Sequence, residues 1–324
     1  MLKTIIRFLT PIVVLGVALV GGWGLLTVLG NADKAFEASR KAARASAMQQ
    51  EEAPATQVAP PATPYPWLAK YDPANTIGAR IHAPPGYERV QVDPDTLSYW
   101  LRNLPLKPPG TPVRLWNGQE KPFQGGHVAV VDIDVGNEDL QQCADAIIRL
   151  KAEYLYSRRR YRDIHFNFTN GTNVEFVKWA EGIKPIVNGD VVTWTRPRRD
   201  RTRDYSYDNF RAYLETVMTY ADTASLAQEL APVGSPKVMQ ISNIFIQAGH
   251  PGHAAMVVDM CENRRNGAKC FLLAQGFMPA QDIHILRNTR PADTRIWPWY
   301  DVNFGPTLKT PDWQFTRHDL KHFK

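Results

Sequence analysis

The sequence predicts an α+β fold in which a helix that carries a cysteine packs on a mostly antiparallel sheet, behind an N-terminal transmembrane helix. Three observations lead to this prediction. Residues 8–32 form an uncharged, largely apolar run, residues 137–157 carry apolar side chains at helical spacing, and residues 243–278 alternate short apolar runs with Gly, Pro and Asn. These patterns are typical of a membrane span, of an amphipathic helix, and of strands joined by tight turns.

The amino-terminal run is expected to be an uncleaved signal anchor. Lys3 and Arg7 precede it, and it reaches the length of about 20 apolar residues that crosses a bilayer as a helix. A cleaved signal peptide would have a shorter apolar core and a small-x-small cleavage site, and none is clear before Asn31. Positive charge before the span favours a cytoplasmic amino terminus. The rest of the chain would then face the periplasmic or extracytoplasmic side of a bacterial cytoplasmic membrane.

The chain is predicted to have three parts. The anchor at 1–32 is followed at 33–66 by a helical stalk and a Pro/Ala-rich linker, whose composition makes no core. A single globular domain then covers 67–324. Much of the net charge of +6 lies at 158–162 and 196–203, which are either solvated loops or contacts with an anionic surface such as lipid or wall polymer. No recognisable binding module accompanies the charge, so nucleic acid is not an expected partner.

Residues 137–157 form the predicted helix that bears the cysteine. Asn137 is a good N-cap, and the two acidic residues that follow it suit the first turn of a helix. The apolar face comprises Leu140, Cys143, Ala144, Ile147, Leu150 and Tyr154. Cys143 is therefore expected in the second turn, on the buried stripe. A free cysteine there is either a small hydrophobic core residue or a thiol kept for chemistry.

Residues 243–278 predict a strand, a glycine-rich corner, a second strand, a hairpin turn and a third strand. His253 opens the middle strand directly after Pro251 and Gly252. A histidine that a constrained corner holds in place is a candidate general base.

Three cysteines are an odd number for a chain outside the cytoplasm. Cys261 and Cys270 flank the predicted hairpin turn. A two-residue Asn-Gly turn would place Cys261 opposite Leu272, whereas a wider loop would place the two cysteines opposite each other. Because a disulfide needs Cα atoms within about 7 Å, the pairing stays open, and it would leave Cys143 as the only free thiol.

A cysteine nucleophile needs a base, a group that orients the base, and an oxyanion site. Cys143 near a helix N-terminus and His253 at a strand start are the predicted nucleophile and base, and a helix N-terminus lowers the pKa of a thiol. Gln141 and Gln142 stand beside the cysteine and would offer an amide donor.

Gln275 and Gln281 are the predicted orienting residues. A simple Asn-Gly hairpin puts Gln275 on the opposite sheet face from His253, whereas a three-residue turn with a bulge at Gly267 restores the same face. Even then we expect Gln275 to lie several residues along the strand, too far for a direct hydrogen bond. Gln281 is nearer in that register.

Four motifs of the sequence are distinctive: Asp-Leu-Gln-Gln-Cys-Ala-Asp-Ala at 139–146, Gly-His-Pro-Gly-His-Ala-Ala-Met-Val-Val-Asp-Met at 249–260, Leu-Leu-Ala-Gln-Gly-Phe-Met-Pro-Ala-Gln-Asp-Ile-His-Ile-Leu at 272–286, and Tyr-Trp-Leu-Arg-Asn-Leu-Pro-Leu at 99–106. They resemble those of a bacterial family of unknown function, numbered 4846. The family implies no activity. A weaker resemblance is to the papain-like NlpC and CHAP cysteine amidases of the cell wall, which implies Cys143 as nucleophile and Gly252-His253-Ala254 as the base region. Ser242-Asn243 replaces the usual Gly-Asp, and the Cys-to-His gap is longer than usual.

Other chemistry has little support in the sequence. His250 with His253, and His284 with Asp282, lack further zinc ligands at suitable spacing. No phosphate loop, dinucleotide fingerprint or Gly-x-Ser-x-Gly elbow is present, so no metal or cofactor is expected. The predicted function is a cell-envelope cysteine hydrolase that cleaves an amide, such as a peptidoglycan peptide. The alternative is a non-catalytic, membrane-anchored envelope module that binds wall polymer or a partner protein.

Overall fold

The computed structural model describes residues 63–200, 202–289 and 294–324, all within one unit of the chain, Pro54–Lys324. The predicted signal anchor, the stalk and nearly all of the linker lie outside the described residues. Within the described ranges, no helix has the length and apolar character that a membrane crossing requires.

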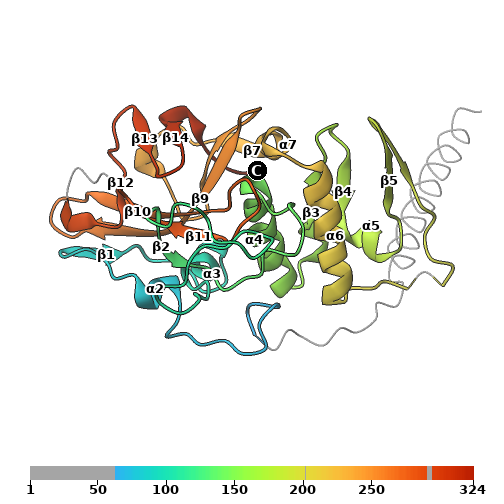
Figure 1. Ribbon diagram of the computed structural model, residues 1–324, viewed down its shortest axis with the longest axis horizontal. Helices are drawn as coiled ribbons and strands as arrows, with labels where there is room; N and C mark the ends of the chain where they lie inside the picture. Colours follow the sequence, from blue (N-terminus) through green and yellow to red (C-terminus); the bar gives the residue numbers. More distant parts are fainter. Residues whose placement is uncertain (1–62, 201, 290–293) are drawn as a thin grey trace, which may run out of the picture. The chain divides into compact units, whose positions relative to one another are not determined.

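The main sheet has nine strands and is antiparallel at every pairing, which confirms the predicted α+β class with a mostly antiparallel sheet (Figure 1). The strands run in the order β2-β11-β10-β9-β8-β15-β7, with β1 paired to β9 and β12 paired to β10. Their bounds are β1 Tyr87–Arg89, β2 His127–Val130, β7 Leu230–Pro232, β8 Ile244–Gln247, β9 His253–Asn263, β10 Lys269–Gln275, β11 His284–Leu286, β12 Tyr300–Asp301 and β15 Leu320–Phe323.

Three two-stranded sheets and the helices complete the described fold. The small sheets are β3 His165–Asn167 with β4 Asn173–Glu175, β5 Pro185–Asn188 with β6 Val191–Trp194, and β13 Thr307–Lys309 with β14 Gln314–Thr316. The α-helices are α2 Ile77–Arg80, α3 Leu97–Arg102, α4 Cys143–Ser157, α5 Phe176–Ala180, α6 Tyr207–Tyr220 and α7 Thr223–Gln228. Short 3₁₀ turns occupy Tyr161–Asp163, Pro236–Val238, Thr294–Ile296 and Arg317–Asp319.

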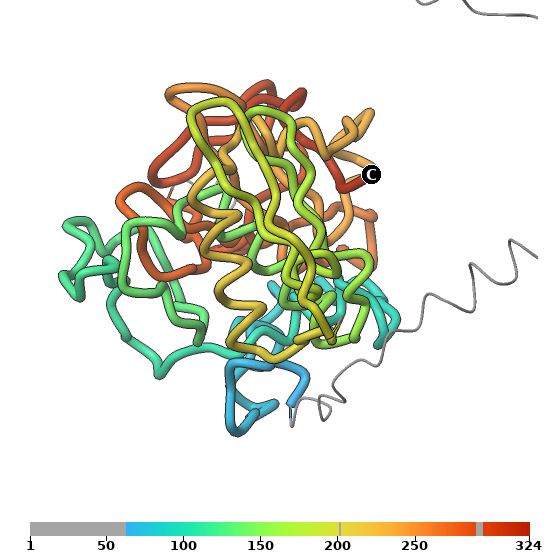
Figure 2. Tube along the Cα trace, turned by 90° about the vertical axis from the view of Figure 1, so that its right-hand side faces the viewer, coloured from blue at the N-terminus to red at the C-terminus, as the bar shows by residue number. Residues whose placement is uncertain are grey.

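Helix α4 lies between the main sheet and helix α6 (Figure 1). Figure 2 looks from the α6 side and places α6 and the β5–β6 hairpin in front of the sheet. Strand β9 is buried from His253 to Cys261 because neighbouring strands pair with it on both sides and α3 and α4 pack on it. A strand that is buried on both faces has a nearly continuous run of apolar residues instead of alternating apolar and polar ones, and the sequence of β9 has such a run.

Helix α4 begins at Cys143, so the predictions of an N-cap at Asn137 and of Cys143 in the second turn are wrong. The N-cap is Gln142, whose backbone N–H donates to Asp145 Oδ2 at 3.1 Å. Asp139, predicted in the first turn, instead accepts a hydrogen bond from the Ala280 backbone N–H at 2.6 Å. This long-range contact and the turn at 139–140 occupy the segment before Cys143, so the helix begins later than predicted.

The hairpin between β9 and β10 has the wider loop that the sequence left open as the alternative to a two-residue Asn-Gly turn. Asn263 pairs with Ala268 around a four-residue loop, and Cys261 lies directly opposite Cys270. Both thiols are buried and free, as is Cys143. The register shifts by one residue between Leu272 and Leu273, far from the bulge considered at Gly267.

Gly276, just after β10, lets the N-terminus of α4 approach the sheet. A Cβ atom on Gly276 would lie 2.8 Å from the Gln142 carbonyl oxygen and 3.1 Å from the Ala146 Cβ. Any larger side chain would push the helix away. The helix start that carries Cys143 is therefore seated directly on the end of strand β10.

Candidate active site

Cys143 is the first residue of α4 and is 6% exposed. In the first turn of a helix the backbone N–H groups have no acceptor four residues earlier, so they leave a partial positive potential at this end. The backbone N–H of Ala254, the residue after His253, is also close enough to the sulfur to lower its pKa. The Cys143 thiol at the start of α4 therefore lies next to the backbone at the start of strand β9.

His253 is the first residue of β9 and is only 1% exposed. Its ring is surrounded by aromatic side chains, with centroid distances of 4.9 Å to Phe277, 5.2 Å to Trp313 and 5.7 Å to Phe315. The corner before it depends on Gly252, since a Cβ there would lie 2.4 Å from both the Gly249 carbonyl oxygen and Thr223 Oγ1. The three aromatic neighbours and the tight corner fix the position of the imidazole.

Gln275 hydrogen-bonds directly to His253, with 2.8 Å between Oε1 and the ring Nε2. The prediction that it lies too far away is therefore wrong. The bulge explains the contact, because beyond it Ala274 pairs with Met256. The next step of the ladder places Gln275 opposite Ala255, on the face of His253 and two residues from it. Such diagonal neighbours are within reach of long side chains.

The orientation of the Gln275 amide follows from its other partners. Its Nε2 donates to Asp312 Oδ2 at 2.8 Å and lies 3.4 Å from His284 Nε2. The two N–H bonds of the NH₂ group thereby point to Asp312 and His284, and Oε1 faces His253 as an acceptor. The hydrogen bond then requires a proton on His253 Nε2, which leaves Nδ1 with its lone pair.

Two further contacts hold this network. Lys121 Nζ lies 2.7 Å from Asp312 Oδ2 and keeps that carboxylate in place. The His284 Nδ1 lies 2.8 Å from the Asp282 carbonyl oxygen, so Nδ1 carries the proton and Nε2 accepts from Gln275. No pattern in the sequence identifies Lys121 or Asp312, and no short motif links Asp312 to Gln275, which is 37 residues away.

Replacing Asp312 with leucine is expected to release the Gln275 amide and to mix the two neutral tautomers of His253. In the unaltered protein the ring should be neutral at about pH 7, because burial lowers the pKa of His253 to about 4. Its one proton should lie on Nε2, which faces the Gln275 oxygen. Asp312→Asn keeps an acceptor oxygen and should preserve this tautomer. NMR of the ring nitrogens measures the populations directly. A predominant Nδ1–H form in the unaltered protein would contradict the assignment.

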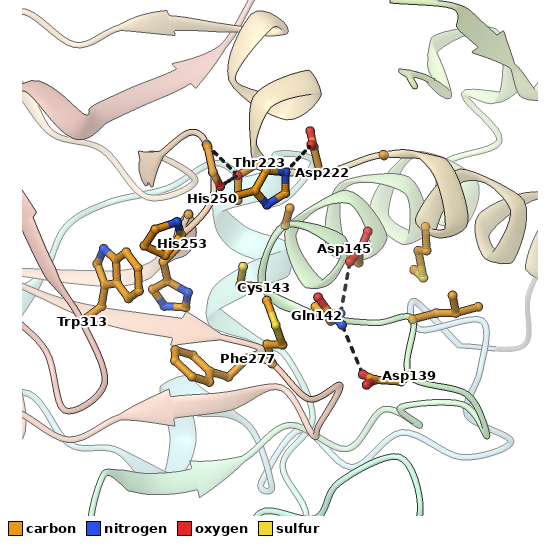
Figure 3. A pocket seen from close by; sticks show the side chains of 18 of the residues that line it. Asp139, Gln142, Cys143, Asp145, Asp222, Thr223, His250, His253, Phe277 and Trp313 are labelled. Atoms are coloured by element: carbon orange, nitrogen blue, oxygen red, sulfur yellow. Dashed lines mark hydrogen bonds and ion pairs between the residues drawn. The ribbon is translucent and has the colours of Figure 1, made fainter. Parts of the chain in front are cut away.

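Cys143 and His253 line one cavity of about 630 Å³ (Figure 3). It lies between the start of α4, the end of α6, the start of α7, the corner at 249–252 and the loop that carries Phe277. Figure 3 shows Phe277 and Trp313 beside His253, and His250 pointing toward Asp222. The cavity is lined by Asp139, Leu140, Gln142, Cys143, Ala144, Asp145, Met218, Thr219, Ala221, Asp222, Thr223, Gly249, His250, Pro251, Gly252, His253, Phe277, Met278 and Trp313.

Burial keeps the thiol and the imidazole neutral. Removal from water raises the pKa of Cys143 to about 11, although the Ala254 N–H opposes the rise. The same effect lowers the pKa of His253 to about 4, against the opposing influence of its bond to Gln275. At neutral pH the site therefore holds a thiol and a neutral imidazole rather than a thiolate–imidazolium pair.

Alkylation of Cys143 by iodoacetamide is expected to accelerate about tenfold per pH unit between about pH 7 and pH 10, because only the thiolate reacts. The raised pKa of Cys143 sets this range. Mass spectrometry of the labelled peptide measures the rate, and urea-unfolded protein provides the comparison, with a plateau near the ordinary thiol pKa of about 8.5. A rate that is already constant between about pH 6 and pH 8 would indicate a preformed thiolate and contradict the neutral pair.

The remaining glutamines are placed differently. Gln281 pairs through its backbone with Leu115, and no hydrogen bond in the described ranges joins it to His253. Gln141 turns away from the cavity, with Oε1 accepting from Arg149 at 2.5 Å. Gln142 lines the cavity, and its amide Nε2 donates to Asp139 Oδ1 at 3.2 Å. Gln142 is thus the amide donor that the structure places beside Cys143.

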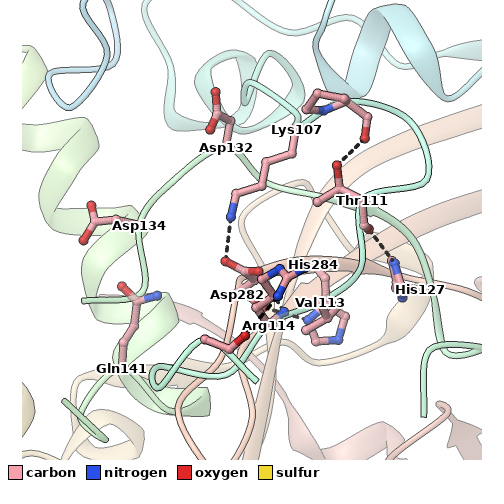
Figure 4. Close-up of polar contacts among 12 residues, drawn as sticks. Lys107, Thr111, Val113, Arg114, His127, Asp132, Asp134, Gln141, Asp282 and His284 are labelled. Carbon is pink, nitrogen blue, oxygen red and sulfur yellow. Dashed lines mark hydrogen bonds and ion pairs between the residues drawn. The ribbon is translucent and has the colours of Figure 1, made fainter. Parts of the chain in front are cut away.

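His284 and Asp282 belong to a polar cluster that adjoins this network through the contact between His284 and Gln275 (Figure 4). The Asp282 carboxylate accepts from Lys107 Nζ at 2.8 Å and from the Arg114 backbone N–H at 2.9 Å. His127 Nε2 lies 3.3 Å from the Thr111 carbonyl oxygen. In the part of the chain that the structure describes, no group of three or more His, Cys, Asp or Glu side chains could hold a metal ion.

Comparisons with known proteins agree with the first resemblance seen in the sequence. The model of a family described as "Domain of unknown function (4846)" matches residues 77–322. No curated protein and no solved structure matches the chain.

Proposed function

We propose that this chain, which belongs to the family described as domain of unknown function 4846, is a cysteine hydrolase that cleaves an amide bond. Cys143 would be the nucleophile, His253 the general base, and Gln275 the residue that orients the base. One observation carries the proposal: a cysteine at a helix N-terminus and a histidine bonded to a fixed amide line the same cavity. The order of helix cysteine and strand histidine supports a papain/NlpC-like mechanism.

The proposed reaction begins with attack of Cys143 Sγ on the substrate carbonyl carbon while His253 Nδ1 takes the thiol proton. The backbone N–H of Cys143 and the side-chain amide of Gln142 would donate hydrogen bonds to the oxyanion. His253 then returns the proton to the leaving nitrogen as the C–N bond breaks, which yields a thioester. Water, deprotonated by the same Nδ1, attacks the thioester, and the thiol and a carboxylic acid are released.

Both catalytic groups start neutral in this scheme, so proton transfer accompanies attack as in a serine hydrolase. The hydrogen bond from Nε2–H to Gln275 becomes stronger when the ring is positively charged. Asp312, which accepts from Gln275, adds negative charge behind that bond, and Lys121 beside Asp312 offsets part of it. The network therefore stabilises the imidazolium that forms during the reaction.

The cell envelope is the proposed location, and wall peptides are the proposed substrates. The support is in the sequence: the apolar run at 8–32, the linker at 33–66 and the arginine-rich segments at 158–162 and 196–203. The anchor would hold the domain at the outer side of the membrane, and the arginines would face lipid headgroups or wall polymer.

A second candidate is a non-catalytic envelope module that binds wall polymer or a partner protein in the same cavity. The neutral, buried state of Cys143 favours it, because a thiol with a raised pKa is a weak nucleophile without a base that acts on it. The two candidates differ in whether Cys143 becomes acylated.

Incubation with para-nitrophenyl acetate, an activated ester that demands little substrate recognition, tests the hydrolase. We expect a burst of nitrophenol, an acetyl thioester on Cys143 identified by peptide mapping, and continued turnover as the thioester hydrolyses. Cys143→Ala should abolish the burst. Cys261 and Cys270 serve as internal controls, since both are fully buried. No acetylation of Cys143, or acetylation equal to that of the unfolded chain, would favour the binding module.

A further inference from the structure

Asp145 is a buried acid in the first turn of α4, two residues after Cys143, and it is 5% exposed. Its Oδ2 accepts the Gln142 backbone N–H at 3.1 Å. Its Oδ1 is buried and has no hydrogen-bond partner among the described residues. An unpaired buried carboxylate oxygen costs free energy, so this position is suited to a donor that arrives from outside the chain.

The ionisable side chains of the cavity wall make it acidic. Asp139, Asp145 and Asp222 line it, whereas no lysine or arginine does so within the described ranges. This contrasts with the formal net charge of +6 for the whole chain. No ion pair in the described ranges involves Asp145, and burial, with a smaller contribution from Asp222, raises its pKa to about 8. Its carboxyl group is therefore largely protonated at neutral pH until a cation binds beside it.

The three acids differ in how far the protein already satisfies them. Asp139 Oδ1 is taken by the Ala280 N–H and by Gln142 Nε2, at 2.6 and 3.2 Å. Asp222 Oδ1 caps helix α7, while its Oδ2 lies 3.7 Å from His250 Nε2, beyond a good hydrogen bond. Among the described residues, Asp139 Oδ2, Asp145 Oδ1 and Asp222 Oδ2 therefore carry no close hydrogen bond. Asp139 is exposed to water, whereas Asp145 is buried and Asp222 half-buried, so the last two are the less hydrated acceptors for a ligand.

We propose that Asp145 and Asp222 recognise a protonated amino group of the substrate, so that the hydrolase acts on peptide amides with a free amine near the scissile bond. The proposal rests on the proposed function and names the substrate class of the same site. An ammonium group offers three N–H donors and one positive charge, which match two acceptor oxygens in an acidic wall. Met218, Phe277, Met278 and Trp313 supply the apolar surface for the carbon skeleton beside it.

Binding to the full-length Cys143→Ala protein, which holds the cavity but does not react, tests this recognition. The probes are L-alanyl-L-alanine amide, which has a free amine, and its N-acetyl derivative, which has none. NMR titration of the carboxyl carbons and calorimetry should show at least about tenfold tighter binding of the free amine, with the shift centred on Asp145. Adding Asp145→Asn should remove the preference, and Asp95→Asn, an exposed acid outside the cavity, should retain it.

Proton release gives a second readout. Binding of the ammonium should lower the pKa of Asp145 and release protons near neutral pH, as calorimetry in buffers of different ionisation enthalpy measures. The other ionisable liners are Asp139, Cys143, Asp222, His250 and His253. Both measurements use the Cys143→Ala protein. The difference in proton release with and without Asp145→Asn gives the protons that come from Asp145 rather than from the other lining residues.

Equal affinity for the two peptides, including no detectable binding of either, would overturn the inference. A preference that survives Asp145→Asn would overturn it as well. Acylation of Cys143 by para-nitrophenyl acetate without an amine preference would leave the hydrolase standing and reject the recognition site. An amine preference without acylation of Cys143 would support the amine-recognition site and reject the hydrolase.

Discussion

Replacing His253 with alanine is expected to slow the acylation of Cys143 by para-nitrophenyl acetate by about 10²–10⁴-fold, the usual contribution of a general base. The reason lies in the neutral thiol: burial raises the pKa of Cys143, so little thiolate exists without a base to remove the proton. The lone pair of His253 Nδ1 is available for this because Nε2 is committed to Gln275. Stopped-flow measurement of the nitrophenol burst gives the rate.

His250→Ala is the matched control for this experiment, because His250 lines the same cavity three residues earlier but is largely exposed. It should lower the burst rate far less, by under about tenfold, since it lacks an orienting amide. Circular dichroism and thermal unfolding confirm that each variant is folded. Equal effects of the two substitutions would reject His253 as the base. If neither substitution changes the burst rate, the proposed hydrolase mechanism is contradicted.

Replacing Asp145 with asparagine is expected to stabilise the protein by a few kcal/mol at about pH 8 and by little at about pH 4. The folded-state pKa of Asp145 is about 8, above its ordinary value of 3.8. Between those values the unfolded chain releases the proton that the folded protein keeps, so stability falls as pH rises through this window. Asparagine carries no charge and still offers an oxygen to the Gln142 N–H.

Urea unfolding from about pH 4 to pH 9 measures this difference, with Asp95→Asn as the control for the loss of one exposed negative charge. A stability gain that does not change with pH would show that Asp145 is not the acid that titrates. A pH-dependent gain together with lost amine binding would mean that the fold tolerates a destabilising carboxyl group where a ligand needs it. Such a trade between stability and function is common at binding sites.

Several features of the site were accessible from the sequence because they depend on local patterns. Apolar runs broken by Gly, Pro and Asn place His253 at the start of a strand and Cys261 beside a hairpin turn. Helical spacing places Cys143 on a helix that ends at Ser157. These patterns arise from the periods of single elements, which a chain carries whatever surrounds it.

Only the tertiary structure decided the features on which the site depends. The contact between Asp139 and Ala280, 141 residues apart, starts the helix at Cys143 instead of a turn and a half earlier. The register shift after Leu272 turns Gln275 to the face of His253. Both depend on distant partners.

The sequence by itself therefore determined the α+β class, the family, and the nucleophile and base to test. The tertiary structure decided the orienting amide, the Asp312–Lys121 support behind it, and the unpaired acid that faces the cavity. The physical reason is that side-chain periodicity is a property of one segment. Strand register, burial and hydrogen-bond satisfaction are set jointly by segments far apart in the chain.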